Sequence, residues 1–352
     1  MASDTVNTAI KTAQRLQNVK SSPTLAVTQK VAELRAMGRE VLALGAGEPD
    51  FKTPKHIQQA AVDALNAGHT GYTPADGIPE LKQAIIDKFS RDNGLEYTPA
   101  QILVSVGGKH SCYNLAQALI NPGDEVIIPA PYWTSYPDIV KLAGGNPVIV
   151  QTGIERNFKI TPDQLRTSIT EQTKLFMINS PSNPTGMNYT PEELAELGQV
   201  LLDAPRVVIA TDDMYEHVRW SGEFVNIVNA CPALYDRTLV MNGVSKAYAM
   251  TGWRIGYVGG PESLVSAMKK VQSQTTSNPT SISQYAACEA LNGDQSFVAK
   301  MVKAFKARHD FVVDALLQIE GIKCQPNDGT FYCFPNIQGL LDRLPDIQND
   351  TD

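Results

Sequence analysis

Short apolar runs alternate with helical patterns along most of this chain, and this alternation restricts the fold more than any other feature. Most of the apolar runs are bounded by polar residues, Gly or Pro, as expected for strands buried on both faces of a mostly parallel sheet. The sequence therefore predicts an α/β fold with helices on both faces of the sheet, a three-layer α/β/α arrangement. The seven predicted strands span residues 102–106, 125–129, 147–151, 174–179, 206–211, 238–242 and 255–258.

Helix signals are clearest at TPKHIQQAAVDALNAG. This string predicts a helix with Thr53 as its N-cap, Pro54 at its first position and Gly68 after its end. A second helical region is predicted from Ser281 through Ile319.

The length of the chain predicts more than one domain. At 352 residues it exceeds the size at which one hydrophobic core usually stops growing. We expect an N-terminal arm with a small-domain segment (1–45), a large domain that carries the sheet (46–285) and a smaller α+β domain (286–352). The string GTFYCF, residues 329–334, predicts one more strand in that smaller domain.

Composition excludes several classes of protein. The chain has 30 basic and 37 acidic residues, a net charge of −7, and no cluster of Lys and Arg that would bind nucleic acid or anionic lipid. The N-terminus lacks the apolar region of a signal peptide, and no apolar run is long enough to span a bilayer. Five cysteines, an odd number without a C-x-x-C spacing, predict a reduced, cytoplasmic protein.

Polar residues follow four of the predicted strands. The string VSV is followed by GGKH, FMI by NSPSNPTG, VIA by TDDMYEH and VMN by GVSK. Ligands of open α/β sheets bind beyond the carboxyl ends of the strands. These four strand ends are therefore the predicted site.

The residue types at these strand ends suit a phosphorylated aromatic aldehyde. A buried lysine such as Lys246 can lose its proton and form a Schiff base with a carbonyl. A buried Asp212 needs a cationic partner, which a protonated ring nitrogen supplies. Gly107 and Gly108 begin a helix whose positive end suits a phosphate, and Arg254 adds a second contact to it. Pyridoxal 5′-phosphate satisfies all of these requirements.

Each residue taken alone has a simpler interpretation. The GAG string at 45–47 is no dinucleotide fingerprint because residue 50 is Asp, and NPTG around Asn183 is a common turn. Trp133 would by default be a packing aromatic, and His110 and His217 satisfied polar groups. No cysteine, histidine or acid spacing predicts a metal site. The prediction rests on the joint placement of the residues at successive strand ends.

Seven longer strings lie between Pro23 and Phe334. They are LGAGEPDF, YTPADGIPELK, VGGKH, PGDEVIIPAPYWTSY, NSPSNPTG, TDDMYEH and NGVSKAYAMTGWRIGY. In these strings the chain resembles the fold-type I, class I/II aminotransferases that depend on pyridoxal 5′-phosphate. Within that family it is most similar to the bacterial aspartate aminotransferase group.

The resemblance implies a role for each residue that contacts the cofactor ring. Lys246 would form the Schiff base with the cofactor and move the proton between substrate and cofactor. Asp212 would hold the ring nitrogen protonated, and Asn183 and Tyr215 would donate hydrogen bonds to the ring oxygen. Trp133 would stack on the ring, and both Trp133 and Asn183 would also contact the substrate.

The remaining implied roles concern phosphate, substrate and a second subunit. Gly108, Lys109 and Arg254 would bind the phosphate, and Tyr72 would reach the cofactor of the neighbouring subunit in a homodimer. Gly45 would lie beside the substrate carboxylate. Lys109 is the candidate for binding the distal carboxylate of an acidic substrate.

The chain departs from the family pattern at two places. Gly243 stands where other members have a serine, so one hydrogen bond to phosphate is expected to be absent. No arginine after Arg343 lies in the R-L-S-like context that binds the substrate α-carboxylate in the family, so the small domain is expected to be incomplete.

Four functions follow from these features. The first is transfer of the amino group of L-aspartate to 2-oxoglutarate, giving oxaloacetate and L-glutamate. The second keeps the fold and cofactor but acts on other amino acids, as an aromatic, kynurenine, alanine or prephenate aminotransferase or a β-lyase. The third is a cofactor-binding fragment with little turnover. A Schiff-base aldolase without cofactor is a remote fourth, because Asp212 and the phosphate-site residues would have no task.

Overall fold

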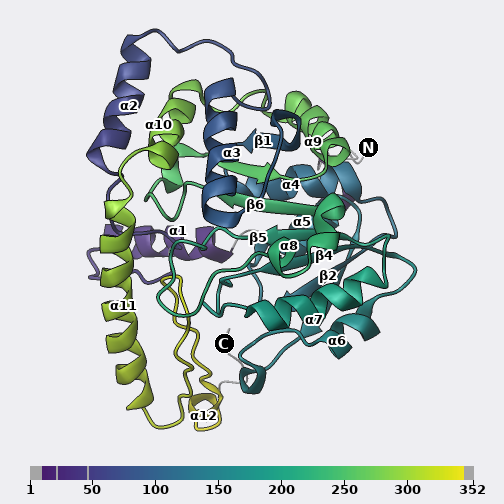
Figure 1. Cartoon of the computed structure of the whole chain (residues 1–352). Coiled ribbons are helices and arrows are strands. Elements are labelled where there is room, and N and C mark those ends of the chain that lie inside the picture. The colour runs from purple at the N-terminus through teal and green to yellow at the C-terminus, as the bar shows by residue number, and fades with distance from the viewer. Residues whose placement is uncertain (1–9, 21–22, 46, 345–352) are drawn as a thin grey trace, which may run out of the picture.

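A central sheet with helices on both sides dominates the computed structural model, which describes residues 10–20, 23–45 and 47–344 (Figure 1). All seven predicted strands are present, and their ends agree with the prediction within two residues. The strands are β1 (Ile102–Ser105), β2 (Glu125–Ala130), β3 (Asn146–Gln151), β4 (Thr173–Asn179), β5 (Val208–Asp212), β6 (Thr238–Gly243) and β7 (Gly256–Gly259).

The sheet has the strand order β1-β7-β6-β5-β4-β2-β3. Four neighbouring pairs are parallel, whereas β7 runs antiparallel to both β1 and β6. The prediction of a mostly parallel sheet is therefore confirmed. The sequence did not predict that β7 runs in the reverse direction. Because β7 is reversed, it begins at the edge where β4, β5 and β6 end.

Both faces of the sheet are buried. Successive side chains along a strand enter opposite cores, so that Val104 and Phe176 lie in one apolar cluster and Leu103 and Met177 in the other. Full burial of such a side chain contributes about 1.5 to 3 kcal/mol. This alternation explains why the strands read as continuous apolar runs, and it confirms the three-layer arrangement.

Helices on the two sides of the sheet complete these clusters. The first cluster includes residues of α2 (Lys55–Asn66), α3 (Pro79–Asn93), α6 (Pro162–Ser168), α7 (Pro191–Leu202), α8 (Ile227–Ala230) and α10 (Ser281–Asn292). The second includes residues of α4 (Gly108–Leu119), α5 (Ser135–Leu142) and α9 (Glu262–Thr275). The remaining α-helices of the described residues are α1 (Pro23–Ala36), α11 (Ser296–Leu317) and α12 (Gln338–Leu341).

The predicted start of α2 is wrong in its details. The Thr53 hydroxyl does not cap the helix but donates to the Ala249 carbonyl at 2.7 Å, and Pro54 is the N-cap residue rather than the first helical one. The predicted end is confirmed, because Gly68 follows the helix with φ of +81°. The Thr53 side chain, which local signals assign to the helix cap, thus forms a tertiary hydrogen bond instead.

The predicted strand over GTFYCF is also wrong. Only isolated bridges occur near it among the described residues, from Gly329 to Arg219 and from Asn336 to Lys323. Thr330 has φ of +70°, which interrupts an extended backbone, and its N–H donates to the Val218 carbonyl. The predicted helical region from 281 to 319 is confirmed as α10 and α11.

A third apolar cluster joins α11 to the loop after β5. It contains Tyr215 and Val218 from that loop and Met301 and Phe305 from α11, with Phe331 packed against them. The boundaries near residues 45 and 285 stay predictions. Within the described residues, no helix combines the length and apolar character that crossing a membrane requires.

Candidate functional site

The sheet brings the predicted polar residues to one edge. The last residues of β4 and β5, Asn179 and Asp212, are paired in register, and Asp212 is paired in turn with Met241 of β6. Because parallel strands end at the same edge, the segments that follow β4, β5 and β6 meet there. The reversed β7 adds the residues that precede it.

Lys246 follows the end of β6 and is largely removed from solvent. Its Nζ donates to the Gly47 carbonyl and lies 5.8 Å and 5.7 Å from the ring centroids of Tyr215 and Phe331. Burial is the main cause that lowers the pKa of Lys246 to about 8; Glu48 opposes the shift and Arg254 reinforces it. A lysine with this pKa has more neutral, nucleophilic amine near pH 7 than a surface lysine.

Asp212 ends β5 with its carboxylate held from two sides. Tyr136 Oη donates to Oδ2 at 2.6 Å, and the Met214 N–H donates to Oδ1 at 3.2 Å. Burial raises the pKa of Asp212, whereas these hydrogen bonds and the charge of Lys246 lower it, and the net shift is upward. A cationic hydrogen-bond donor at this position would stabilise the carboxylate.

Asn183 and Tyr215 both contact the hydroxyl group of Tyr332. The Tyr215 and Tyr332 hydroxyls are 2.7 Å apart, and Asn183 Nδ2 donates to Tyr332 Oη at 3.4 Å. Burial raises the pKa of Tyr215 well above its usual value, so the phenol keeps its proton. The backbone of Asn183 is fixed by Asn179, whose Oδ1 accepts from the Asn183 N–H at 2.6 Å.

The start of α4 forms a tight cradle with Arg254. Gly107 precedes the helix with φ of +85°, and a side chain there would overlap the Arg254 guanidinium. A side chain on Gly256 would overlap the backbone of Gly108. Helix N-termini present free N–H groups and a positive dipole end, so this cradle suits an anion.

Lys109 and Trp133 lie together beside this cradle. Lys109 Nζ is 5.1 Å from the Trp133 ring centroid, and the ring packs edge-on against Tyr136 at 5.3 Å. Burial, followed by the charge of Arg254, lowers the pKa of Lys109. Tyr136, which packs against Trp133 and donates to Asp212, thus connects the Lys109 cation and the Trp133 ring to the Asp212 carboxylate.

Two predicted residues lie apart from this arrangement. The Tyr72 side chain is 94 % exposed, so it has little packing against the rest of the chain. Gly45 is exposed, and a side chain on it would meet Val27 of α1. Gly47, two residues further on, is the one that contacts Lys246.

Sequence analysis missed four residues of this site. Tyr136 lies within PYWTSYP, a string in which Trp133 was the predicted residue. Asn179 is the first residue of NSPSNPTG, a string in which Asn183 was the predicted residue. Gly47 and Tyr332 are separated by 199 and 149 residues from their partners Lys246 and Asn183. Such long-range contacts leave no local pattern.

Comparison with known proteins identifies the family. A family model described as aminotransferase class I and II matches residues 39–346. The aspartate/prephenate aminotransferase of Nitrosomonas europaea is 57 % identical over 97 % of this chain and 87 % of that protein. The aspartate aminotransferase of Geobacillus stearothermophilus is 54 % identical over 93 % of this chain and 83 % of that protein.

Solved structures agree with the sequence matches. An aspartate aminotransferase from Rhizobium meliloti superimposes with a TM-score of 0.91 at 47 % identity, covering 94 % of this chain and 83 % of that one. The Thermus thermophilus aspartate aminotransferase with maleate gives 0.89 at 42 % identity, covering 93 % and 85 %. The chain therefore belongs to the class I and II aminotransferases.

Proposed function

We propose that this aminotransferase uses pyridoxal 5′-phosphate to transfer the amino group of L-aspartate to 2-oxoglutarate, giving oxaloacetate and L-glutamate. The observation that carries the proposal is that Lys246, whose pKa is lowered to about 8, and the partly buried carboxyl of Asp212 follow or end neighbouring strands at one sheet edge. The names of the Nitrosomonas and Geobacillus relatives support aspartate as the amino donor.

The residues of the site fit pyridoxal phosphate in three respects. The cradle at Gly107, which leaves no room for a side chain beside Arg254, suits the phosphate. The raised pKa of Asp212 marks a carboxyl that gains from a cationic partner, as the protonated ring nitrogen would be. The donors Asn183 and Tyr215 lie together, as a ring oxygen requires.

This fit assigns one role to the cofactor and a separate role to each residue around it. When bound, pyridoxal phosphate supplies the aldehyde that takes the amino group and a ring that delocalises the electrons left after loss of the α-proton. Lys246 would bind the aldehyde carbon and move the proton at the substrate Cα. Asp212, held by Tyr136, would keep the ring nitrogen protonated. Tyr215 and Asn183 would donate hydrogen bonds to the ring oxygen, and Trp133 would pack against the ring.

The visible spectrum of the chain with pyridoxal phosphate tests this proposal. We expect an absorbance band from the lysine-bound cofactor, which L-aspartate converts to the pyridoxamine form. If the band forms and aspartate leaves it unchanged, the assignment of substrate is wrong and only cofactor binding is supported. If no band forms, the cofactor assignment itself fails.

Lys109 is the proposed determinant of acidic substrates. In Lys109→Ala, we expect kcat/KM for aspartate to fall about 10- to 100-fold, because a hydrogen bond to a charged group is lost. The value for alanine should stay within about threefold, since alanine has no distal carboxylate to bind. Steady-state kinetics with both amino acids provides the measurement, and an equal loss for both would show that Lys109 does not select the side chain.

Prephenate is a second candidate substrate. The name of the Nitrosomonas relative includes it, and the Trp133 ring beside Lys109 offers an apolar face next to a cation. Comparing half-reaction rates with aspartate, phenylalanine, alanine and glutamate, and with prephenate as acceptor, ranks the candidates. A clear preference for a neutral amino acid would remove the aspartate assignment.

We also propose a homodimer with shared active sites. Among the described residues up to Tyr72, five large apolar side chains are 72 % to 96 % exposed, a pattern typical of a surface that a partner covers. They are Ile10, Met37, Leu42, Leu44 and Tyr72. Tyr72 is the proposed contact to the neighbouring cofactor phosphate.

The proposed location is the cytoplasm, which suits the five unpaired cysteines.

Charge placed on this surface tests the dimer. In Leu44→Asp, we expect light scattering to give about half the mass of the unaltered protein, because an unpaired buried charge strongly disfavours association. Leu317→Asp, at the exposed end of α11, serves as the control and should leave the mass unchanged. A single, monomeric mass for the unaltered chain would refute the proposal.

A further inference from the structure

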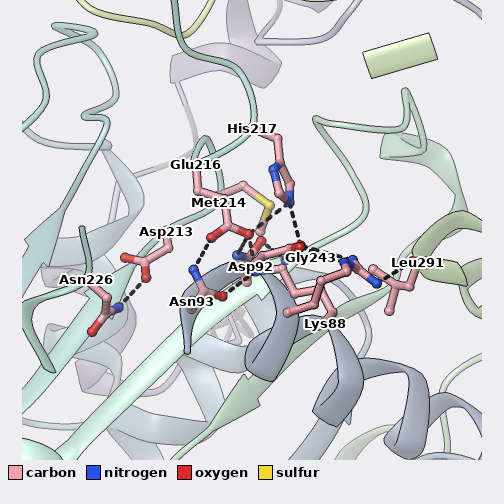
Figure 2. A network of polar contacts seen from close by, with 12 residues as sticks. Lys88, Asp92, Asn93, Asp213, Met214, Glu216, His217, Asn226, Gly243 and Leu291 are labelled. Carbon is pink, nitrogen blue, oxygen red and sulfur yellow. Dashed lines mark hydrogen bonds and ion pairs between the residues drawn. The ribbon is translucent and has the colours of Figure 1, made fainter. Parts of the chain in front are cut away.

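A buried polar network lies next to the residues that lead to Lys246 (Figure 2). At its centre is an ion pair between Lys88 of α3 and Glu216, whose side chains are 1 % and 3 % exposed. Removing two charges from water is costly, and the cost is offset only when further hydrogen bonds complete the pair.

Two asparagines complete the pair. Asn93 Nδ2 donates to Glu216 Oε2 at 2.8 Å while Asn93 Oδ1 accepts from Lys88 at 2.7 Å. Asn242 Nδ2 donates to Glu216 Oε1 at 2.8 Å. Burial raises the pKa of Glu216, but Lys88 and His217 outweigh it and the net shift is downward, so the carboxylate is ionised.

A metal ion is not needed to explain this cluster. Ligand atoms of Asp92, Glu216 and His217 lie within 4.8 Å of one another. Lys88 already supplies a positive charge to Glu216, and Arg91 pairs with Asp92 at 2.7 Å. The acids are therefore neutralised by the chain itself.

The two asparagines belong to different elements and differ in their distance along the sequence from Lys246. Asn93 is the last residue of α3, and its backbone carbonyl accepts from Asn229 of α8. Asn242 belongs to β6, and its Oδ1 accepts from the Gly243 N–H at 2.7 Å, just before the turn to Lys246. Glu216, its other partner, directly follows Tyr215. One side chain thus connects the segments that carry two residues of the proposed site.

We propose that Asn242 is a positioning residue, which fixes the loop of Lys246 relative to Tyr215 by bridging Glu216 to the backbone of Gly243. The inference rests on the proposed function, in which Lys246 is the reactive amine. Three charged groups, Glu48, Arg254 and Asp212, act on the Lys246 amine, and the neutral ring of Tyr215 lies beside it. Loosening the loop would admit water to this amine and favour its protonated form.

Competitive acetylation of the cofactor-free chain tests the proposal. The pH dependence of Lys246 acetylation by acetic anhydride, read by peptide mass spectrometry, reports the pKa of its amine. In Asn242→Leu we expect this pKa to rise by about one unit, because desolvation of the amine is relieved. Asn93→Leu, which removes two hydrogen bonds from the same ion pair, should leave it unchanged. Urea unfolding verifies that both variants are folded.

Each outcome bears on the inference. An unchanged pKa in Asn242→Leu, or an equal rise in Asn93→Leu, would overturn it. If Asn242→Leu does not fold, Asn242→Ser replaces it; failure of both while Asn93→Leu folds would assign Asn242 to the stability of the whole fold and refute the positioning role. Because the labelling needs neither cofactor nor turnover, its result is independent of whether aspartate is the substrate.

Discussion

Replacing Lys246 by alanine is expected to lower kcat for transamination on the order of 10⁴-fold or more, since the variant loses both a nucleophile and a proton carrier. The Lys246 amine combines a lowered pKa with contacts to the Gly47 carbonyl and the Tyr215 ring. Single-turnover absorbance measurements with aspartate provide the test. The visible band of the lysine-bound cofactor should also be absent.

A matched control separates this effect from loss of positive charge. Lys109 lies at the same edge, and its pKa is lowered by burial as well. Lys109→Ala should retain the visible band and lose rate only with acidic substrates. A normal band in Lys246→Ala would show that another amine binds the aldehyde.

Asp212→Asn is expected to lower kcat about 10²- to 10³-fold, as loss of a preorganised electrostatic contact typically does. The amide keeps the size of the side chain and can still accept from Tyr136, so the change removes little besides the negative charge. Stopped-flow measurement of the half-reaction with aspartate gives the rate. A loss of less than about threefold would mean that the carboxylate is not what keeps the ring nitrogen protonated.

The neighbouring acid supplies the control for Asp212. Asp213 is 1 % exposed and thus more deeply buried than Asp212, and burial, reinforced by Glu216, raises its pKa to about 8. It is therefore mostly protonated at pH 7, where Asp213→Asn exchanges one neutral group for another. We expect this variant to keep kcat within about threefold. The two substitutions are chemically identical and adjacent, so a loss of rate in Asp212→Asn alone would show that the effect belongs to the position of Asp212 and not to any carboxyl group of this segment.

Local patterns predicted the strands well because these strands are buried on both faces. Each apolar run, such as that of Phe176, is long enough to mark a strand without reference to its neighbours. The direction of β7 could not be predicted, since nothing local distinguishes parallel from antiparallel pairing. The cap at Thr53 and the strand at Phe331 failed for a related reason: tertiary hydrogen bonds and a positive φ at Thr330 override the local preference.

The site was predictable to the extent that its residues stand at strand ends. Lys246, Asp212 and Asn183 were proposed in this way, and the segments that carry them meet at one edge of the sheet. Tyr136 and Tyr332 were not, because an aromatic residue within an apolar string is indistinguishable from a packing residue until its hydroxyl is seen to meet a partner. Their hydrogen bonds span 76 and 117 residues of sequence.

The reversed direction of β7 has a consequence for how this site could be exchanged or redesigned. The chain leaves the sheet at Gly243 and re-enters at Gly256 on the same edge, and these two residues are paired in register. Lys246 and Arg254 therefore travel on one short excursion that is closed at its base by the sheet. The segment is nevertheless held by the rest of the fold, because Lys246 donates to the Gly47 carbonyl and the Ala249 carbonyl accepts from Thr53. An exchange of this segment between relatives would therefore have to keep the partner residues around Gly47 and Thr53 as well.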